Sequence, residues 1–259
     1  MVFGRGLGLG LGLMGFRRIR HGEVDSTNER ALAALAEGTA RHGDVHVALA
    51  QTAGRGRRGR EWESARGAGL YMSVVLRPGA ALAPSALSIA AGLAVRDALA
   101  TLGLRDVRLK WPNDVVCADA KVAGILIETR GLDPRAPHYV VGIGVNVSQA
   151  RFSDELARTR AVTSMRLSGS RASVQDCERT LLAHLARRLG QIEGDGARLG
   201  RDYLGALALA GEQVRVHDPA GEWAGELLDL DLERGFCVRT PEGELRRVAL
   251  EGLRRLLRG

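Results

Sequence analysis

The stretch VHVALAQTAGRGRRGREWESARGAGLYMSVVL at residues 45–76 contains two short apolar runs separated by a long loop rich in arginine and glycine. The runs 45–50 and 70–76 have the length and apolar character of buried β-strands. The loop from Thr52 to Gly69 shows no apolar period, and a long irregular loop between two strands is usually functional or disordered. This stretch therefore predicts a sheet-containing domain with a functional loop.

The centre of that loop, GRGRRGR at residues 54–60, has the chemistry of an anion site, and Trp62 follows it. Glycine lets backbone N–H groups approach a ligand closely, and arginine forks bind phosphate or carboxylate. The same composition is typical of RNA-binding arginine–glycine segments, so the loop alone leaves both interpretations open. Its position between two core strands, beside a ring that can stack on a purine, favours a nucleotide site.

Two further motifs contain the only lysines of the chain. In LKWPNDVV, Lys110 ends a strand, and Asn113 and Asp114 follow in a turn that Pro112 makes rigid. An amide there can bind a base, and a carboxylate can hold a cation or orient a donor. In KVAGILIE, Lys121 begins the next strand.

Glycines mark the expected floor of a ligand site. The apolar strand VVGIGVNVS, residues 140–148, places Gly142 and Gly144 two positions apart, so that both lie on one face and leave a flat slot for a thin ligand. Asn146 continues this face. Gly124, in the preceding strand, permits a similarly close approach.

The composition excludes several classes of protein. With 45% hydrophobic and 26% charged residues, the 259-residue chain can bury a sizeable core. The formal charge of +7 points to anionic partners, although an arginine-rich composition by itself is weak support. Three cysteines without a CxxC pair indicate a reducing compartment, and no apolar run is long enough to span a bilayer. We therefore expect a cytoplasmic protein without a membrane anchor.

Periodicity and turn signals predict the remaining elements. Ser26 with Glu29, and Ser173 with Asp176, are expected to form helix N-caps of the capping-box type. Helices are expected over 84–102 and 173–189, and strands over 107–110, 115–117, 121–128 and 139–147. A glycine-rich break at 190–200, a last short helix and then short strands between 213 and 250 complete the chain.

These patterns divide the chain into three segments. Residues 1–20, with alternating glycine and leucine, are expected to be a flexible tail, or a tail that begins only at Met14. Residues 21–210 are expected to form the catalytic domain, which binds the ligands, and residues 211–259 a small β domain that packs on it.

Together, DSTN at residues 25–28, GRGRRGR with its following tryptophan, KWPND, KVAGILIE and GIGVN resemble the biotin–protein ligase family in type and order. The resemblance implies an α+β fold: a mixed β-sheet catalytic domain with helices on one side, like a class II synthetase, plus a C-terminal SH3-like β-barrel. It implies biotin and MgATP as substrates and biotinyl-5'-AMP as the intermediate. It also implies a monofunctional member without an N-terminal helix-turn-helix, so no DNA partner is expected.

The resemblance also assigns residues. Biotin contacts are expected from Ser26, Thr27, Asn28, Gln51, Gly54, Arg55, Lys121, Gly124, Gly142 and Gly144. Contacts to ATP or the adenylate are expected from Arg57, Arg58, Arg60, Trp62, Asn113, Asp114 and Asn146. Catalytic charge is expected from Lys121, Arg57, Arg55 and Lys110. No fixed metal site is expected, because Mg²⁺ arrives with ATP, although Asp114 could hold it.

The expected partner is a biotin carboxyl carrier domain with an acceptor lysine, and a homodimer is compatible with the resemblance. Two alternatives remain: a lipoate or octanoate ligase that shares the fold, and a nucleic-acid-binding protein that uses the arginines as an electrostatic clamp. We expect the loop 54–60 to order over the adenylate as a lid, because a mixed anhydride exposed to water hydrolyses.

Overall fold

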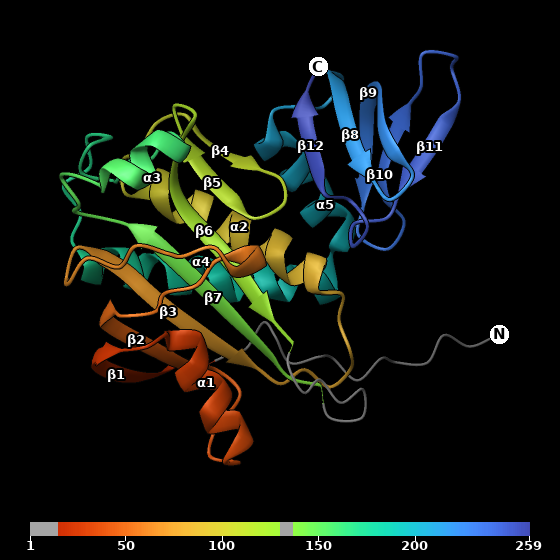
Figure 1. Cartoon of the computed structure of the whole chain (residues 1–259). Helices are drawn as coiled ribbons and strands as arrows, with labels where there is room; N and C mark the ends of the chain where they lie inside the picture. Colours follow the sequence, from red (N-terminus) through yellow and green to blue (C-terminus); the bar gives the residue numbers. More distant parts are fainter. Residues whose placement is uncertain (1–14, 130–136) are drawn as a thin grey trace.

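A computed structural model describes residues 15–129 and 137–259, which form two lobes (Figure 1). The strands of the larger lobe are β1 (Arg17–Val24), β2 (Asp44–Gln51), β3 (Gly69–Leu76), β4 (Val107–Lys110), β5 (Asp114–Cys117), β6 (Ala120–Glu128) and β7 (Tyr139–Asn146). The helices are α1 (Thr27–Ala36), α2 (Pro84–Thr101), α3 (Asp154–Thr159), α4 (Val174–Gly194) and α5 (Gly196–Leu207), with a 3₁₀ turn, η1 (Arg57–Gly59). The strands of the smaller lobe are β8 (Gln213–Asp218), β9 (Gly221–Asp231), β10 (Gly235–Arg239), β11 (Leu245–Val248) and β12 (Arg255–Arg258).

The two sheets confirm the predicted α+β fold class. The larger sheet has the order β1-β2-β3-β7-β6-β5-β4 and the smaller sheet the order β11-β10-β9-β8-β12. In the larger sheet, β1 and β2 run parallel and the other described neighbours run antiparallel, so the sheet is mixed as expected. All described pairs of the smaller sheet are antiparallel. Closure of this second sheet into an SH3-like barrel stays a prediction.

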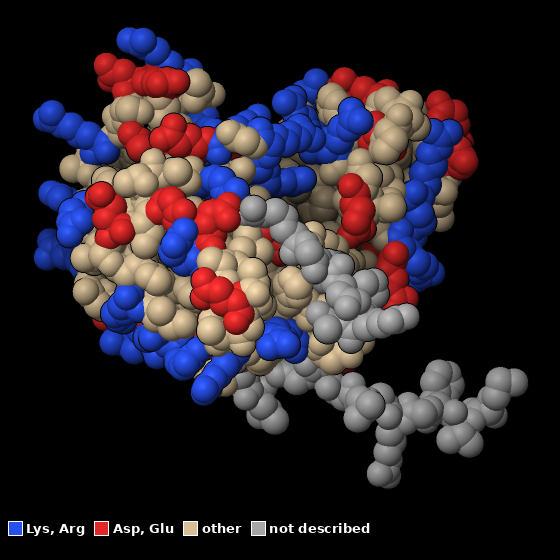
Figure 2. Space-filling view, turned by 60° about the horizontal axis from the view of Figure 1, so that its bottom comes forward, with Lys and Arg blue, Asp and Glu red and all other residues tan. Residues whose placement is uncertain are grey.

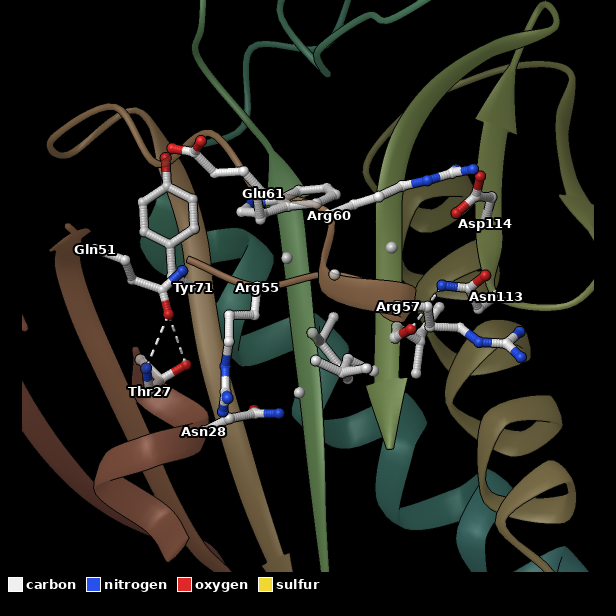
Figure 3. A pocket seen from close by; sticks show the side chains of 18 of the residues that line it. Thr27, Asn28, Gln51, Arg55, Arg57, Arg60, Glu61, Tyr71, Asn113 and Asp114 are labelled. Carbon is white, nitrogen blue, oxygen red and sulfur yellow. Dashed lines mark hydrogen bonds between the residues drawn. The ribbon is translucent and has the colours of Figure 1, made fainter. Parts of the chain in front are cut away.

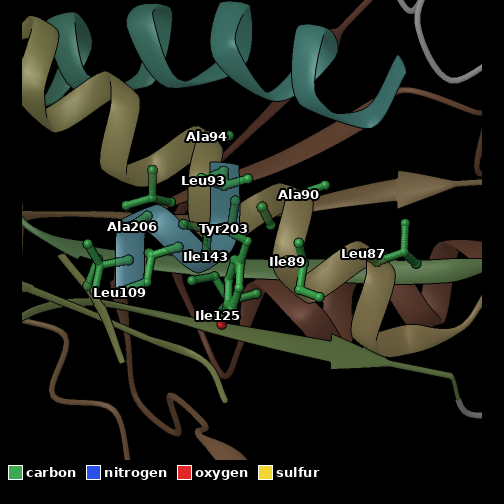
Figure 4. Close-up of a cluster of buried hydrophobic side chains, with 14 of the residues drawn as sticks. Leu87, Ile89, Ala90, Leu93, Ala94, Leu109, Ile125, Ile143, Tyr203 and Ala206 are labelled. Carbon is green, nitrogen blue, oxygen red and sulfur yellow. The ribbon is translucent and has the colours of Figure 1, made fainter. Parts of the chain in front are cut away.

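The hydrophobic core lies between the larger sheet and helices α2, α4 and α5. Helix α2 is apolar nearly all round, and its Leu87, Ile89 and Leu93 are almost fully buried (Figure 4). They belong to one cluster with Ile125 of β6 and Ile143 of β7. Burial on this scale is the main stabilising contribution of the lobe, at about 25 cal/mol for each Å² of apolar surface.

The opposite face of the larger sheet is only partly covered. Strand residues alternate between faces, so Val141 and Ile143 join the α2 cluster while Val140 packs with Ala31 of α1. The expectation of helices on one side therefore holds for α2 and α4, whereas the short α1 covers one end of the other face. The rest of that second face, which carries Gly142 and Gly144, remains available for a ligand.

A buried tryptophan joins the two lobes. Trp111 lies in the turn between β4 and β5, and its indole N–H donates to the carbonyl of Leu253, 3.0 Å away. Its ring also meets Phe236 of β10 edge-on, with centroids 5.3 Å apart. The smaller lobe therefore supports the turn that carries Asn113 and Asp114.

Two local expectations near the start of the chain differ from the structure. Strand β1 begins at Arg17, so residues 17–20 belong to the fold rather than to the tail, while the tail residues 1–14, Met14 included, lie outside the described residues. Ser26 precedes α1 but makes no side-chain cap, its N–H donates to Asp25 Oδ1, and Glu29 pairs with Arg55. The capping box at Ser173 is confirmed.

The expected glycine-rich break at 190–200 is wrong. Helix α4 continues to Gly194 and α5 starts at Gly196, because the buried Leu189 and Leu199 on either side hold both helix ends against the core. The last helix ends at Leu207 and the next strand begins at Gln213, so the proposed domain boundary after residue 210 lies between them. No helix in the described parts of the chain is long and apolar enough to cross a membrane.

Candidate active site

A pocket opens on the second face of the larger sheet, above β6 and β7 (Figure 3). It is bordered by the start of α1, the arginine–glycine loop (residues 54–60), the turn at 113–114 and Arg160. The predicted site residues that line it are Thr27, Asn28, Gln51, Arg55, Arg57, Arg60, Trp62, Asn113, Asp114, Lys121, Gly124, Gly142 and Gly144. Segments far apart in the sequence thus meet where the resemblance expects a common site.

One end of the pocket has a buried polar wall at the start of α1. The backbone N–H and the hydroxyl of Thr27 both donate to Gln51 Oε1, at 2.8 and 3.1 Å. The hydroxyl of Ser73 lies 2.5 Å from Asn28 Oδ1 and 2.7 Å from Thr27 Oγ1. Because hydrogen bonds within the protein fix these side chains, they can bind a polar ring at little ordering cost.

The floor of the pocket is made of glycine. Gly124 and Gly144 are paired across β6 and β7, and a Cβ atom at either position would press on the Trp62 ring. A Cβ atom at Gly142 would collide with the Asn28 amide. These glycines therefore keep room for flat groups on the sheet, as expected from their spacing.

Trp62 itself occupies the slot above Gly124 and Gly144. Its indole N–H is buried without a hydrogen-bond partner, and Lys121 Nζ lies 5.3 Å from the ring centroid. The ring is thus close enough to the sheet and to a cation to form one wall of an aromatic binding site.

The arginine–glycine loop is folded back on itself. Gly56 N–H donates to Arg60 O at 2.7 Å, Trp62 N–H donates to Gly54 O at 2.9 Å, and Arg55 and Glu61 form an isolated β-bridge. A Cβ atom at Gly54 would strike the Trp62 carbonyl, so Gly54 is required by the close approach of the two loop strands. It does not line the pocket.

The loop arginines differ in their partners. Arg55 pairs with Glu29 and also with Glu128 Oε2 at 3.0 Å, and Glu128 accepts a bond from Asn28 Nδ2 at 2.9 Å. Arg55 points down towards Asn28 in Figure 3. Two carboxylates therefore compensate its charge, which suits a role in positioning the loop and Asn28 more than binding a free anion.

Arg57 and Arg60 are available for an anion. Within residues 15–129 and 137–259, neither guanidinium has a carboxylate within ion-pair distance, and Figure 3 shows Arg60 extending over β6 towards Asp114. Desolvation at the pocket mouth and the neighbouring charge of Arg58 lower the pKa of Arg57. An arriving phosphate would relieve this crowding of positive charge.

Lys121 is the cation nearest the centre of the site. Its ammonium contacts Asp114 Oδ1 at 2.5 Å, and only 12% of its side chain is exposed. Burial lowers the pKa of Lys121, Asp114 opposes that shift, and the charges of Arg160 and Arg60 reinforce it. The amide of Asn113 donates to Ile125 O at 2.9 Å, which fastens the turn carrying Asp114 to β6.

The structure does not bring five predicted residues into the pocket lining: Ser26, Gly54, Arg58, Lys110 and Asn146. Asn146 is buried, and its amide donates to Thr163 O at 3.0 Å. Ser26 is buried at the start of α1, with its N–H bonded to Asp25. Lys110 and Arg58 line an adjacent groove that extends between α3 and β12. Their predicted ligand contacts therefore remain predictions.

Sequence reasoning overlooked several residues of the site. Tyr71 lines the pocket from β3, and its hydroxyl donates to Ala65 O at 2.9 Å. Glu128 and Ser73 fix Asn28, as described above. Arg160 lines the pocket from the end of α3. Tyr71 and Ser73 resemble ordinary strand residues, and Arg160 does not stand out in an arginine-rich chain.

The chain is similar to several known proteins. A profile of the "Biotin/lipoate A/B protein ligase family" matches residues 22–146. The "Biotin--[acetyl-CoA-carboxylase] ligase" of Paracoccus denitrificans is 37% identical over 226 residues, which cover 85% of this chain and 93% of that protein. The "Bifunctional ligase/repressor BirA" of Salmonella typhimurium is 41% identical over 144 residues, which cover 54% of this chain and only 43% of that protein.

A solved structure shows the same fold. The structure titled "Biotin protein ligase from Aquifex aeolicus in complex with biotin and ATP" superposes with a TM-score of 0.79 at 30% sequence identity. The match covers 94% of this chain and 99% of that chain. It therefore includes both lobes.

Proposed function

Because the chain belongs to the biotin/lipoate A/B protein ligase family, we propose that it is a biotin–protein ligase that joins biotin to a lysine of a carboxylase carrier domain. MgATP drives the reaction through biotinyl-5'-AMP. One observation carries the proposal: a flat, glycine-floored slot ends beside Lys121 and two arginines that have no ion pair among the described residues. Such a slot suits a thin ring system linked to a carboxylate that must meet a triphosphate.

In the first step, a carboxylate oxygen of biotin attacks the α-phosphorus of ATP. The bond from that phosphorus to the bridging oxygen of the β-phosphate breaks, and pyrophosphate leaves with the electron pair. Both reactants are anions, so the barrier comes mainly from like-charge repulsion and from placement. Lys121, Arg57 and Arg60 offer fixed positive charge at the end of the slot.

In the second step, the neutral amine of the acceptor lysine attacks the carbonyl carbon of the adenylate, and AMP leaves. The amine loses a proton as the amide forms. Trp62 would stack on the adenine and Thr27, Asn28 and Gln51 would hold the ureido ring end, as the family resemblance implies. Stacking of this kind contributes about 1 to 3 kcal/mol.

Magnesium would neutralise phosphate charge when it enters with ATP. Within the described residues, no group of three His, Cys, Asp or Glu side chains could hold a metal ion alone. Asp114 and Glu61 are carboxylates that line the pocket, and a carboxylate plus phosphate oxygens is the usual donor set for Mg²⁺. The residues therefore fit an ion that is bound largely by the nucleotide.

Other features support the cellular setting that we propose. The three cysteines are free and buried, which fits a reducing cytoplasm. Strand β1 forms one edge of the larger sheet, and an unpaired edge could join two copies into a homodimer. No DNA partner forms part of the proposal.

Exchange of labelled pyrophosphate into ATP tests the proposed function. We expect exchange that depends on biotin and is absent with lipoate, octanoate or no acid. Exchange with lipoate or octanoate instead would indicate a lipoate or octanoate ligase of the same family. No exchange with any acid, together with salt-sensitive binding of RNA or duplex DNA, would reject the ligase in favour of a nucleic-acid-binding protein.

The Arg57→Gly variant tests the lid. Arg57 lies where the pocket opens into the adjacent groove, so its loss should open the route by which the intermediate leaves. We expect partial retention of adenylate formation but faster escape of biotinyl-5'-AMP, measured by pulse-chase. Arg66→Gly removes an exposed arginine outside both cavities and serves as the control. Equal retention of the adenylate by Arg57→Gly and the wild type would contradict the lid.

A further inference from the structure

A segment outside the recognised motifs is fastened to the central lysine of the site. Lys121 N–H donates to Ala161 O, and Thr163 N–H donates to Lys121 O, both at 2.9 Å. These bonds form a parallel bridge between Lys121 and Val162. The residue before this bridge is Arg160, which follows helix α3 directly. Its backbone position is thereby fixed relative to Lys121.

Arg160 lies at the mouth between the pocket and the adjacent groove, and it lines both. It is half-buried, whereas Arg158 on the last turn of α3 is exposed and lines neither cavity. Within residues 15–129 and 137–259, the Arg160 guanidinium has no ion pair or hydrogen bond. Most arginines of a folded surface can find a carboxylate or open solvent, so a half-buried unpaired guanidinium at a cavity mouth indicates a ligand.

Arg160 and two arginines of the arginine–glycine loop line the same mouth. Arg57 and Arg60 come from the loop, and Arg160 comes from the segment that follows α3. Arg160 and Arg60 are both near enough to lower the pKa of Lys121, while Asp114 is the facing carboxylate that raises it. Figure 2 shows basic side chains gathered where the two lobes meet. Positive charge therefore exceeds negative charge around this opening.

The reaction geometry identifies the anion. In the proposed reaction, the biotin carboxylate and the α-phosphate meet at Lys121, and the mouth that Arg57, Arg60 and Arg160 line can take the β- and γ-phosphates. We infer that Arg160 binds the β- and γ-phosphates of ATP, and then the leaving pyrophosphate, from the segment that follows α3. This inference rests on the proposed function. Cations placed on the leaving group stabilise the charge that develops as the phosphorus–oxygen bond breaks.

An acidic surface of the carrier domain is the competing ligand for Arg160, because the groove is also open to a protein. The nucleotide is favoured because Arg160 lines the same pocket as Lys121 and Asp114. The two ligands enter different half-reactions. Kinetics of the separate steps therefore distinguish them.

The test uses R160Q, with R158Q, two residues earlier on the last turn of α3, as the matched control. In biotin-dependent exchange, we expect R160Q to raise the KM for ATP and for pyrophosphate by about tenfold or more, as for a lost charge-assisted hydrogen bond. Transfer of biotin from supplied biotinyl-5'-AMP to the carrier should stay within about twofold of the wild type. R160K should recover part of the loss because it keeps the charge.

Transfer from supplied biotinyl-5'-AMP also shows that each variant is folded. R160M, which keeps the aliphatic stem without the charge, provides a second neutral variant with the same expected pattern. The inference is overturned if R160Q and R160M match R158Q in the exchange assay, or if they raise the KM for the carrier and leave the KM for ATP unchanged. Failure of the wild type to exchange with biotin would instead reject the proposed function.

Discussion

Replacing Lys121 by glutamine should lower the kcat/KM of adenylate formation by about 10²- to 10³-fold, the loss typical of a preorganised charge that stabilises a transition state. Lys121 is largely buried between Asp114 and the Trp62 ring, so solvent cannot replace its ammonium. Glutamine also leaves the Asp114 carboxylate uncompensated beside the incoming phosphates. Both effects raise the barrier for joining two anions.

The double variant Lys121→Gln/Asp114→Asn separates these two effects. It removes the uncompensated carboxylate as well as the ammonium, so it should regain part of the activity lost in the single variant. The activities of the single and the double variant are measured as initial rates of pyrophosphate exchange at saturating biotin. A loss of less than about tenfold in Lys121→Gln would show that the charge is not used in the transition state.

Asp97→Ala should reduce the free energy of unfolding by about 3 kcal/mol or more, since it removes one partner of a buried ion pair. Asp97 on α2 accepts from Arg187 Nη2 and Arg188 Nε of α4, both at 2.8 Å. Arg188, with 6% of its side chain exposed, also pairs with Asp202 of α5 at 2.5 Å. The substitution leaves Arg188 buried with half of its compensation.

Urea denaturation measures this loss, with Glu244→Ala as the control. Glu244 pairs with Arg246 on the surface of the smaller lobe, where both side chains are more than half exposed. Such pairs contribute about 0 to 1 kcal/mol. If Asp97→Ala loses no more stability than Glu244→Ala, the network between α2, α4 and α5 does not stabilise the fold.

Sequence reasoning placed most central strands correctly because their apolar runs and turn residues carry the information locally. Strand β6 was expected over 121–128 and is found over Ala120–Glu128. Strand β1 could not be found in the same way. Its sequence RRIRHGEV has no apolar alternation. Ion pairs to distant residues such as Glu178 hold this strand at the sheet edge instead.

The site was predictable where a motif supplies both chemistry and position. Gly124, Gly142 and Gly144 lie in the pocket because strand alternation fixes the face on which each residue appears. Asn146 does not line the pocket because its amide donates to Thr163 O, and Ser26 is buried at the start of α1 outside the pocket lining. Arg160 was missed because its position depends on the nearby backbone bridge between Val162 and Lys121, which no local sequence pattern predicts.

The tryptophan that covers the glycine floor gives the protein an intrinsic optical reporter. Trp62 fills the slot above Gly124 and Gly144, so any flat molecule that enters must move the indole or share its space. Of the three tryptophans in the sequence, Trp111 is buried between the lobes and Trp223 lies on β9, away from the slot. The fluorescence emission of Trp62 should therefore change when a ligand binds to the site or leaves it, without any attached dye.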